Sequence, residues 1–336
     1  MPGPHPATAA IRSAVRSALA DCSPGAVVLV ALSGGADSTA LAAAAAFESR
    51  AAGVRVGAVV VDHGLQEGSD AVADAAAQGA RTLGIDPLEV VRVEVAPGAD
   101  GVEAAARTAR YAAIDAVAHR FSARLILLGH TLDDQAEQVL LGLARGSGTR
   151  SLSGMPPARD RFRRPLLGVT REQTRASCEA EGLTWWDDPM NEDTAYLRVR
   201  ARRALADLER DLGPGIAAAL ARSADQLRED ADHLDALADA FLAGWRSSER
   251  LRMSPNTSTR QASVPVADLD ALPRAVRTRV WRRLLIAAGA PSGQVSARHT
   301  DECDRLLTHW RGQGPLHVPG DLRVTRAEGM VSIRRG

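Results

Sequence analysis

The sequence predicts an α/β fold in which a Rossmann-like parallel sheet is followed by a smaller, mainly helical domain. Apolar, strand-like runs alternate with helix-length segments over residues 27–128, which is typical of a parallel sheet with helices on both faces. The first such run, Val27–Leu32, passes directly into a glycine turn and an alanine-rich segment. Over residues 215–245, apolar residues recur instead at helical spacing.

The predicted elements of the first half follow a regular order. Strands are expected at 27–32, 54–62, 88–95 and 125–128, with helices from Ser38, over 69–83 and 102–120, and from Leu132. Ligands of such sheets bind beyond the carboxyl ends of the strands. Three of these ends are followed by glycine and polar residues, so we expect one cleft to be lined by Ser33–Ser38, Asp62-His63 and Gly129-His130.

The second half shows helical patterns and no catalytic constellation. After the long helix over 215–245, residues 246–264 are polar and predict a loop. Helices are expected near 272–289 and 296–310, and short strands over 316–326 and 330–334.

The turn after the first strand reads Ser33-Gly-Gly-Ala-Asp-Ser38. Gly34 and Gly35 allow a sharp turn and a close approach of backbone N–H groups to a ligand. The start of the following helix favours an anion, most simply a phosphate or pyrophosphate. A Walker A loop is excluded because the chain contains no lysine, and the glycine spacing is not that of a dinucleotide fingerprint. An ordinary glycine turn is the alternative.

A second polar group occupies the segment His130-Thr-Leu-Asp-Asp-Gln-Ala-Glu137. If a helix begins near Leu132, Asp134 and Glu137 lie three residues apart on one face. Two carboxylates beside a nucleotide suit a metal ion or an ammonium group. Helix capping is the alternative; it explains one acidic residue but not His130, Asp134 and Glu137 together.

Composition favours a cytoplasmic enzyme of two domains. The 336 residues are 45% hydrophobic, no apolar run approaches the ~18 residues of a membrane span, and the proline-rich start lacks the regions of a signal peptide. Residues 1–10 are therefore expected to form a loose tail. The cysteines are too scattered for a disulfide framework, zinc ribbon or iron–sulfur cluster; they are Cys22, Cys178 and Cys303.

All basic residues are arginines, and the formal net charge is zero. Binding of nucleic acid would therefore require local basic patches. Two runs qualify, although each alone is typical of a solvated surface: Arg159, Arg161, Arg163 and Arg164, and Arg198, Arg200, Arg202 and Arg203. Arg107 and Arg110 also share a face of the helix expected over 102–120.

The order of these motifs resembles that of the tRNA(Ile)-lysidine synthetases, a family within the PP-loop (adenine nucleotide alpha hydrolase-like) ATP pyrophosphatases. The resemblance covers about residues 25–205 and predicts a catalytic domain at 1–205 and a tRNA-gripping domain at 206–336. Besides the Ser33 and His130 motifs it is carried by Val61-Asp-His-Gly-Leu65, Glu103-Ala-Ala-Ala-Arg-Thr-Ala-Arg-Tyr111, Arg145-Gly-Ser-Gly148, Gly154-Met-Pro156, Arg164-Pro-Leu-Leu167 and Trp186-Asp-Asp-Pro-Met-Asn-Glu-Asp193.

The resemblance implies ATP-dependent ligation of free lysine to C2 of the wobble cytidine in CAU-anticodon tRNA(Ile). ATP adenylates the C2 oxygen and releases pyrophosphate, and the lysine amine then expels AMP. The product, lysidine, changes codon reading from AUG to AUA. ATP and Mg²⁺ are the implied cofactors, and tRNA(Ile) and lysine the implied partners. No membrane or protein partner is implied, and a homodimer stays open.

The same resemblance assigns roles to single residues. It implies that the ATP phosphates are held by Ser33, Gly34, Gly35, Ala36, Asp37 and Ser38, with Asp37 close to Mg²⁺ and His63 near the nucleotide. Asp134 and Glu137 are expected to hold lysine beside His130, and Asp134 to act as the base. Phosphates of ATP or tRNA are expected at Arg107 and Arg110, and tRNA phosphates at Arg164, Arg198 and Arg202 of the two arginine runs.

Three positions depart from the family pattern, and two other functions stay open. Met190 stands where serine is usual, Val199 where asparagine is usual, and Gln138 where threonine is common. A tRNA thiolase on the same scaffold would need paired cysteines or a cluster. A non-catalytic ATP-binding regulator would not need Asp37, Asp134 and Glu137, whose presence argues for catalysis.

Overall fold

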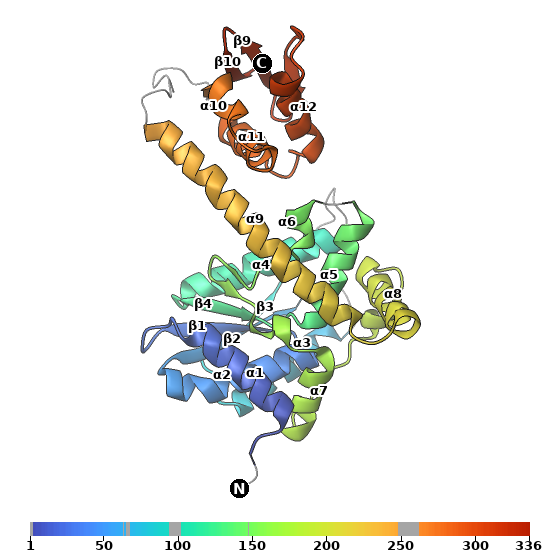
Figure 1. The fold of residues 1–336 in the computed structure, drawn as a ribbon. Helices are drawn as coiled ribbons and strands as arrows, with labels where there is room; N and C mark the ends of the chain where they lie inside the picture. Colours follow the sequence, from blue (N-terminus) through green and yellow to red (C-terminus); the bar gives the residue numbers. More distant parts are fainter. Residues whose placement is uncertain (1–2, 63, 65–67, 94–101, 147, 248–261) are drawn as a thin grey trace. The chain divides into compact units, whose positions relative to one another are not determined.

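The computed structural model describes residues 3–62, 64, 68–93, 102–146, 148–247 and 262–336 (Figure 1). The chain forms two compact units. The first comprises residues 1–147 and 151–225, and the second comprises residues 148–150 and 226–336.

A six-stranded sheet lies at the centre of the first unit, in the order β3-β2-β1-β4-β6-β5. Its strands are β1 (Val27–Leu32), β2 (Arg55–Asp62), β3 (Leu88–Arg92), β4 (Leu125–Leu128), β5 (Ala158–Arg159) and β6 (Phe162–Arg163). All neighbouring pairs are parallel except β5 and β6. The predicted parallel sheet is confirmed, and its central strand β1 pairs with β2 on one side and β4 on the other.

Helices cover both faces of this sheet (Figure 1). On one face, Val28 and Val30 of β1 pack with α1 (Pro6–Leu19), α2 (Ala36–Ala52), α3 (Ser69–Thr82) and α7 (Arg171–Ala180). On the other face, Leu29 packs with α4 (Val102–Arg120). This division follows from the alternation of side chains along a strand. Both faces are covered, which is why β1 and β4 are apolar throughout.

The loose tail expected over residues 1–10 is wrong from Pro6 onward, because α1 begins there. Proline is favourable at a helix start, where its missing N–H has no helical partner to bond. Ile11, Val15 and Leu19 recur every four residues and are buried in the core. The proline-rich beginning therefore marks the start of a helix. Other elements absent from the prediction are the β5–β6 hairpin, α7 and α8 (Leu197–Leu212).

The second unit combines helices with an antiparallel sheet in the order β7-β10-β9-β8. Its helices are the later part of α9 (Ile216–Ser247), α10 (Val266–Asp270), α11 (Arg274–Ala288) and α12 (Ala297–Thr308), and its strands are β7 (Ala262–Pro265), β8 (Leu316–Val318), β9 (Leu322–Ala327) and β10 (Met330–Arg335). Trp281 and Leu285 of α11 pack with Val324 and Ile333 of the sheet. The mainly helical region thus ends in a sheet, of which β7 was expected to be loop.

The compact units divide within α9, at 225/226. Helix α8 belongs to the first unit and packs on α5 (Leu132–Ala144). The functional division expected at 205/206 stays a prediction.

Over the described ranges, no helix combines the length and the apolar character needed to cross a bilayer.

We expect Ile11→Ala to lower the free energy of unfolding by about 2–5 kcal/mol, because it leaves a cavity in a close-packed core. Ile11 is fully buried between α1 and the sheet. Urea unfolding of the full chain measures the change. Leu212→Ala is the control, since Leu212 is 71% exposed and should change stability by less than about 0.5 kcal/mol. Equal stability of the two variants would contradict the docking of α1.

Candidate active site

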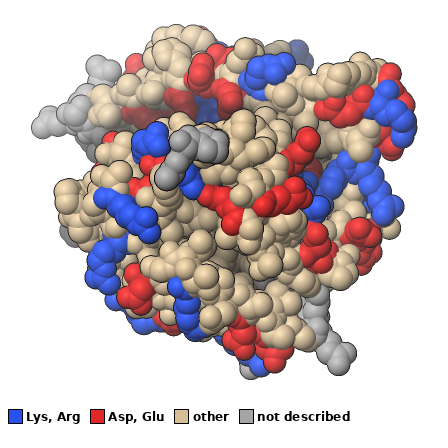
Figure 2. All heavy atoms as spheres, turned by 90° about the horizontal axis from the view of Figure 1, so that it is seen from below, with Lys and Arg blue, Asp and Glu red and all other residues tan. Residues whose placement is uncertain are grey.

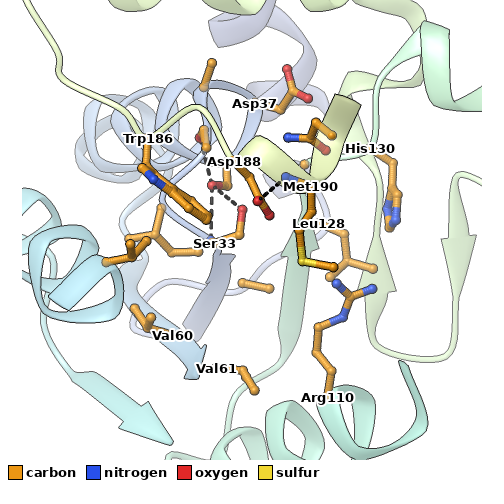
Figure 3. Close-up of a pocket in the computed structure, with 18 of the residues that line it drawn as sticks. Ser33, Asp37, Val60, Val61, Arg110, Leu128, His130, Trp186, Asp188 and Met190 are labelled. Atoms are coloured by element: carbon orange, nitrogen blue, oxygen red, sulfur yellow. Dashed lines mark hydrogen bonds between the residues drawn. The ribbon is translucent and has the colours of Figure 1, made fainter. Parts of the chain in front are cut away.

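A cavity of about 730 Å³ lies at the carboxyl ends of β1, β2 and β4. Its walls come from segments far apart in the sequence: the turn after β1, the ends of β2 and β4, parts of α3, α4, α5, α7 and α8, and the segment 186–192 (Figure 3). Ser33, Asp62, Gly129 and His130 are all among the lining residues. The predicted convergence is therefore confirmed for those residues; His63 lies outside the described residues.

The turn Ser33–Ser38 is held in one conformation by its own hydrogen bonds. The Ser38 hydroxyl accepts from the Ser33 N–H at 3.1 Å and donates to the Gly35 carbonyl at 3.0 Å. Gly34 has a φ of +84°, a backbone conformation that favours glycine. Gly35 is the N-cap of the 17-residue helix α2. The arrangement presents a helix start to the cavity, and a helix start is an anion-binding feature.

Gly129 allows β4 to approach this helix start closely. A Cβ atom at Gly129 would lie 3.2 Å from the Ser38 nitrogen and the Asp37 carbonyl carbon. Both neighbours are backbone atoms that cannot turn away, so a side chain there would displace either β4 or α2. The glycine therefore fixes the end of β4, and His130 after it, against the turn.

The segment 186–192 forms the opposite wall of the turn. The Trp186 N–H donates to the Gly34 carbonyl at 2.9 Å. Asp188 caps the short 3₁₀ helix Pro189–Glu192 by accepting from the Met190 N–H at 2.9 Å. Figure 3 shows Trp186 beside Ser33, and Met190 between Asp188 and Leu128. Met190 lines the cavity, so this departure from the family pattern lies in the site itself.

Asp134 both caps a helix and faces the cavity. Its Oδ2 accepts from the Thr131 N–H at 2.9 Å, while the Thr131 hydroxyl accepts from the Asp134 N–H, which completes a capping box. Its Oδ1 is 3.0 Å from Nη2 of Arg171. The capping and functional interpretations are thus compatible. Burial raises the pKa of Asp134, but Arg171 and the Thr131 N–H outweigh burial and hold that pKa below its usual value.

Glu137 lies behind the cavity wall. Its side chain is 2% exposed, and it is not among the lining residues. Oε1 accepts from Nε of Arg202 at 2.9 Å and from Nη2 of Arg171 at 3.4 Å. Among the described atoms, Oε2 is buried without a hydrogen-bond partner. The helix face shared by Asp134 and Glu137 therefore presents only Asp134 to the cavity.

Asp37 lies in the first turn of helix α2, at the end of the segment Ser33–Ser38, and its side chain contacts α7. Its Oδ1 accepts from the Thr174 hydroxyl, and its Oδ2 is 3.7 Å from Nε of Arg171. Burial raises the pKa of Asp37, and the Thr174 hydrogen bond and Arg171 only partly oppose this. A cation beside Asp37 would stabilise its ionised form.

Arg171 is the central residue that the sequence analysis missed. Its guanidinium faces Asp37, Asp134 and Glu137 together, and its backbone N–H donates to Oδ2 of Asp133 at 2.8 Å. These carboxylates raise the pKa of Arg171 against the opposing effect of burial. The sequence does carry one local signal, the capping box of Thr170 and Gln173 that starts α7. That signal marks a helix start but not the charges it meets.

The predicted phosphate-binding arginines are not equivalent. Arg110 and Arg202 line the cavity, whereas Arg107 is exposed and lies 5.1 Å from the centre of the Tyr111 ring. Arg198 is half-buried on α8 outside the lining. Figure 2 shows arginines interspersed with acidic residues on the face it presents.

Arg164 does not belong to a surface run. Its side chain is buried, with 6% of the residue exposed, and its Nη1 donates to the Pro156 carbonyl at 2.9 Å. Because its guanidinium is enclosed by the protein, this position is not part of an exposed arginine run, and the contact to tRNA expected for it stays a prediction. The charge of Arg164 acts on His130.

His130 lines the cavity as a neutral imidazole. Burial lowers the pKa of His130 to about 4, with Arg164, Arg110 and Arg198 acting in the same direction against Asp134. Its Nδ1 is buried without a partner among the described atoms. The imidazole therefore carries no charge near neutral pH.

Comparisons with known proteins agree with this geometry. Residues 8–209 match the family model of the PP-loop domain, and residues 265–331 match that of the TilS substrate binding domain. The tRNA(Ile)-lysidine synthase of Streptomyces coelicolor is 49% identical over 99% of this chain and 100% of its own length, and that of Thermobifida fusca is 49% identical over 99% of both chains. The chain belongs to the tRNA(Ile)-lysidine synthase family.

A solved structure shares the fold of this family member at low sequence identity. It is the U34-tRNA thiolase NcsA of Methanococcus maripaludis with its [4Fe-4S] cluster, at a TM-score of 0.56 and 19% identity over 66% of this chain and 80% of that chain. The cysteines of the present chain are all free. Cys178 is buried on α7, where burial raises the pKa of its thiol to about 12. Among the described residues, no three His, Cys, Asp or Glu side chains form a metal-binding group.

We expect the His130 imidazole of this family member to titrate near pH 4, because burial and three arginines disfavour its charged form. Histidine side-chain NMR spectra recorded across this range give the midpoint, and His130→Asn assigns the signal. In the unfolded chain this histidine has a pKa near 6.5, so on acidification the unfolded state binds the proton at a higher pH than the native state does. Acidification from about pH 6.5 toward 4 should therefore lower the stability of the wild type more than that of His130→Asn. A midpoint at or above about 6.5 would contradict this environment.

Proposed function

We propose that this protein ligates free lysine to C2 of the wobble cytidine in CAU-anticodon tRNA(Ile), forming lysidine. One observation carries the proposal: an anion-binding turn and an ionised carboxylate, Asp134, line the same cavity and are connected through Arg171. A nucleotide and an amine can therefore meet there. The membership of the chain in the lysidine synthase family supports the choice of substrates.

The turn Ser33–Ser38 and the start of α2 would bind the ATP phosphates. Backbone N–H groups and the helix dipole favour them. Mg²⁺ bound to a nucleotide commonly takes one or two protein carboxylates beside substrate phosphates, and Asp37 is a carboxylate at this turn. Its raised pKa and its place beside the anion site fit such a cation. When bound, Mg²⁺ would neutralise charge on the phosphates.

Asp134 would bind the lysine ammonium group. Its lowered pKa keeps the carboxylate ionised, the residue lines the cavity, and its Oδ1 is 3.0 Å from Nη2 of Arg171. The same lowered pKa makes Asp134 a weak base, so the geometry supports binding of the ammonium more than removal of its proton. Deprotonation of the amine by Asp134 stays a prediction.

The reaction would proceed in two balanced steps. The C2 oxygen of cytidine attacks the α-phosphorus of ATP, a P–O bond forms, and pyrophosphate leaves. The lysine nitrogen then attacks C2 and loses a proton, and the C–O bond breaks to release AMP. Arg110 and Arg202 line the cavity and would stabilise negative charge that develops on phosphate oxygens.

Contacts to the tRNA backbone are proposed for exposed or half-exposed arginines, of which Arg107 and Arg198 belong to the first unit. The region over 265–331 matches a substrate binding domain and would supply further contacts. Such contacts make binding salt-sensitive. A homodimer and a cytoplasmic location stay predictions.

The test measures AMP release from ATP with a CAU-anticodon tRNA(Ile) transcript, with and without free lysine. We expect release by the wild type to depend on lysine and to be absent with elongator tRNA(Met). Asp37→Ala should abolish release, because it removes the carboxylate at the phosphate site. Asp134→Ala should raise KM for lysine about 10–100-fold, the size of one or two pKa units of interaction, while ATP still binds. Asp21→Ala, at an exposed position after α1, is the matched control.

Two outcomes would contradict the proposal. AMP release without any need for lysine would indicate another nucleotide modification on the PP-loop scaffold. ATP binding without turnover would instead favour a non-catalytic, ATP-binding regulator. An unchanged KM for lysine in Asp134→Ala would remove the role assigned to that carboxylate.

A further inference from the structure

Arg171 is placed by contacts at both ends of its side chain. At the backbone end, its N–H donates to Asp133 at 2.8 Å, and the Thr170 capping box fixes the first turn of α7. At the guanidinium end, Nη2 is 3.0 Å from Oδ1 of Asp134 and 3.4 Å from Oε1 of Glu137. The side chain is 21% exposed, and Arg171 lines the cavity. It is therefore held beside the substrate space and has little freedom to turn away.

We propose that Arg171 is a positioning residue that holds the Asp134 carboxylate toward the cavity and thereby sets the affinity for the amino substrate. The inference rests on the proposed function, in which that substrate is lysine. It adds a role for α7, none of whose residues was among the predicted site residues.

Asp134 has two oxygens with different partners. Oδ2 is taken by the Thr131 N–H at the start of α5, so Oδ1 is the oxygen that Arg171 orients. An ammonium that binds Asp134 shares this carboxylate with a guanidinium already in place. Without the guanidinium, Oδ1 would lose its ion-pair partner, and the buried carboxyl group would more readily take up a proton.

Glu137 anchors the guanidinium from behind. Its Oε1 is shared by Arg171 and Arg202, and the side chain lies outside the cavity lining. Contacts thus run from Arg202 through Glu137 to Arg171 and on to Asp134. In this arrangement Glu137 does not line the cavity itself but contacts two arginines that do, Arg171 and Arg202.

A direct phosphate contact is the competing role for Arg171. Its Nε is 3.7 Å from Oδ2 of Asp37 at the phosphate site, but Nη2 makes its hydrogen bonds to Asp134 and Glu137 on α5. The shorter contacts of Arg171 are thus those to the α5 carboxylates, Asp134 and Glu137, and not the one to Asp37 in the turn. The two roles differ in which substrate loses affinity when the guanidinium is removed.

The test uses Arg171→Met and Arg171→Lys in the full chain, with KM for lysine and Kd for ATP measured separately. We expect Arg171→Met to raise KM for lysine about 10–100-fold, which corresponds to one or two pKa units of interaction energy. Kd for ATP should change less than about 3-fold, which corresponds to half a pKa unit. Arg171→Lys keeps the charge but loses the planar fork, so it should recover part of the affinity for lysine. It also carries the test if the methionine variant does not fold.

The pH dependence separates positioning from a loss of structure. The charged and titratable groups that face Asp134 are Arg171 of α7, Arg198 of α8 and His130 after β4, with Asp37 of α2 nearby. Removing Arg171 removes the strongest influence that lowers the pKa of Asp134. The pH at which lysine affinity fails on acidification should therefore move upward in Arg171→Met.

Arg16→Met is the matched control, because Arg16 makes a two-pronged ion pair with the buried Glu48 at 2.8 and 2.9 Å. Neither residue lines the cavity. This variant also removes a guanidinium from a buried carboxylate, yet it should leave KM for lysine and its pH dependence unchanged.

Three results would overturn the inference: equal losses of ATP and lysine affinity, an unmoved acid limb in Arg171→Met, or the same change of KM in Arg16→Met. Lysine-independent turnover by the wild type would instead contradict the proposed function. In that case, carboxylate NMR titration of Asp134 in wild type and Arg171→Met still decides the inference, which requires a higher midpoint in the variant.

Discussion

The ion pairs of Arg171 with carboxylates of α2 and α5 are the interactions on which the geometry of the cavity depends. Asp37, Asp134 and Glu137 are partly or fully buried, and buried carboxylates are costly unless they are paired and hydrogen-bonded. Three of them near one another would also repel. The Arg171 guanidinium of α7 offsets both effects together with Arg202, which pairs with Glu137. It adds ion pairs to the hydrogen bonds that α7 already makes to α2 through Thr174 and to α5 through its backbone N–H.

The sheet supplies the second constraint, because parallel strands end at one edge. Gly129 lets β4 approach the start of α2 to backbone contact, and the Trp186 N–H ties the segment 186–192 to the Gly34 carbonyl. The turn Ser33–Ser38 is thus in contact with β4 through Gly129 and with the segment 186–192 through Trp186. The anion-binding turn and the Asp134 carboxylate reach the same cavity as a consequence of strand order, which explains how one site can serve two substrates.

Local sequence features predicted much of the first unit. The apolar runs at 27–32 and 125–128 coincide with β1 and β4, because strands buried on both faces leave an unbroken apolar pattern. The helix expected from Leu132 is present, and its capping box is visible as Thr131 and Asp134. The turn Ser33–Ser38 could be placed because glycines mark backbone demands that other residues meet poorly.

Features that depend on long-range contacts could not be predicted in this way. Arg171 lies 37 residues from Asp134 and 34 from Glu137 along the chain, and no local pattern reports those meetings. Arg164 looked like part of a surface run, but tertiary packing buries it. Proline suggested a tail at residues 1–10, whereas Pro6 starts α1. Glu137, which lies outside the cavity lining, likewise meets Arg202 of α8 across 65 residues of chain.

The most direct test of the account is to find where the lysine goes. Isotopically labelled lysine is incubated with the protein, ATP and the CAU-anticodon tRNA(Ile), and the tRNA is digested to nucleosides for mass spectrometry. The account predicts a wobble cytidine derivative that carries the labelled lysine, formed only with ATP. Recovery of unmodified cytidine, or of a modified nucleoside without the label, would contradict it.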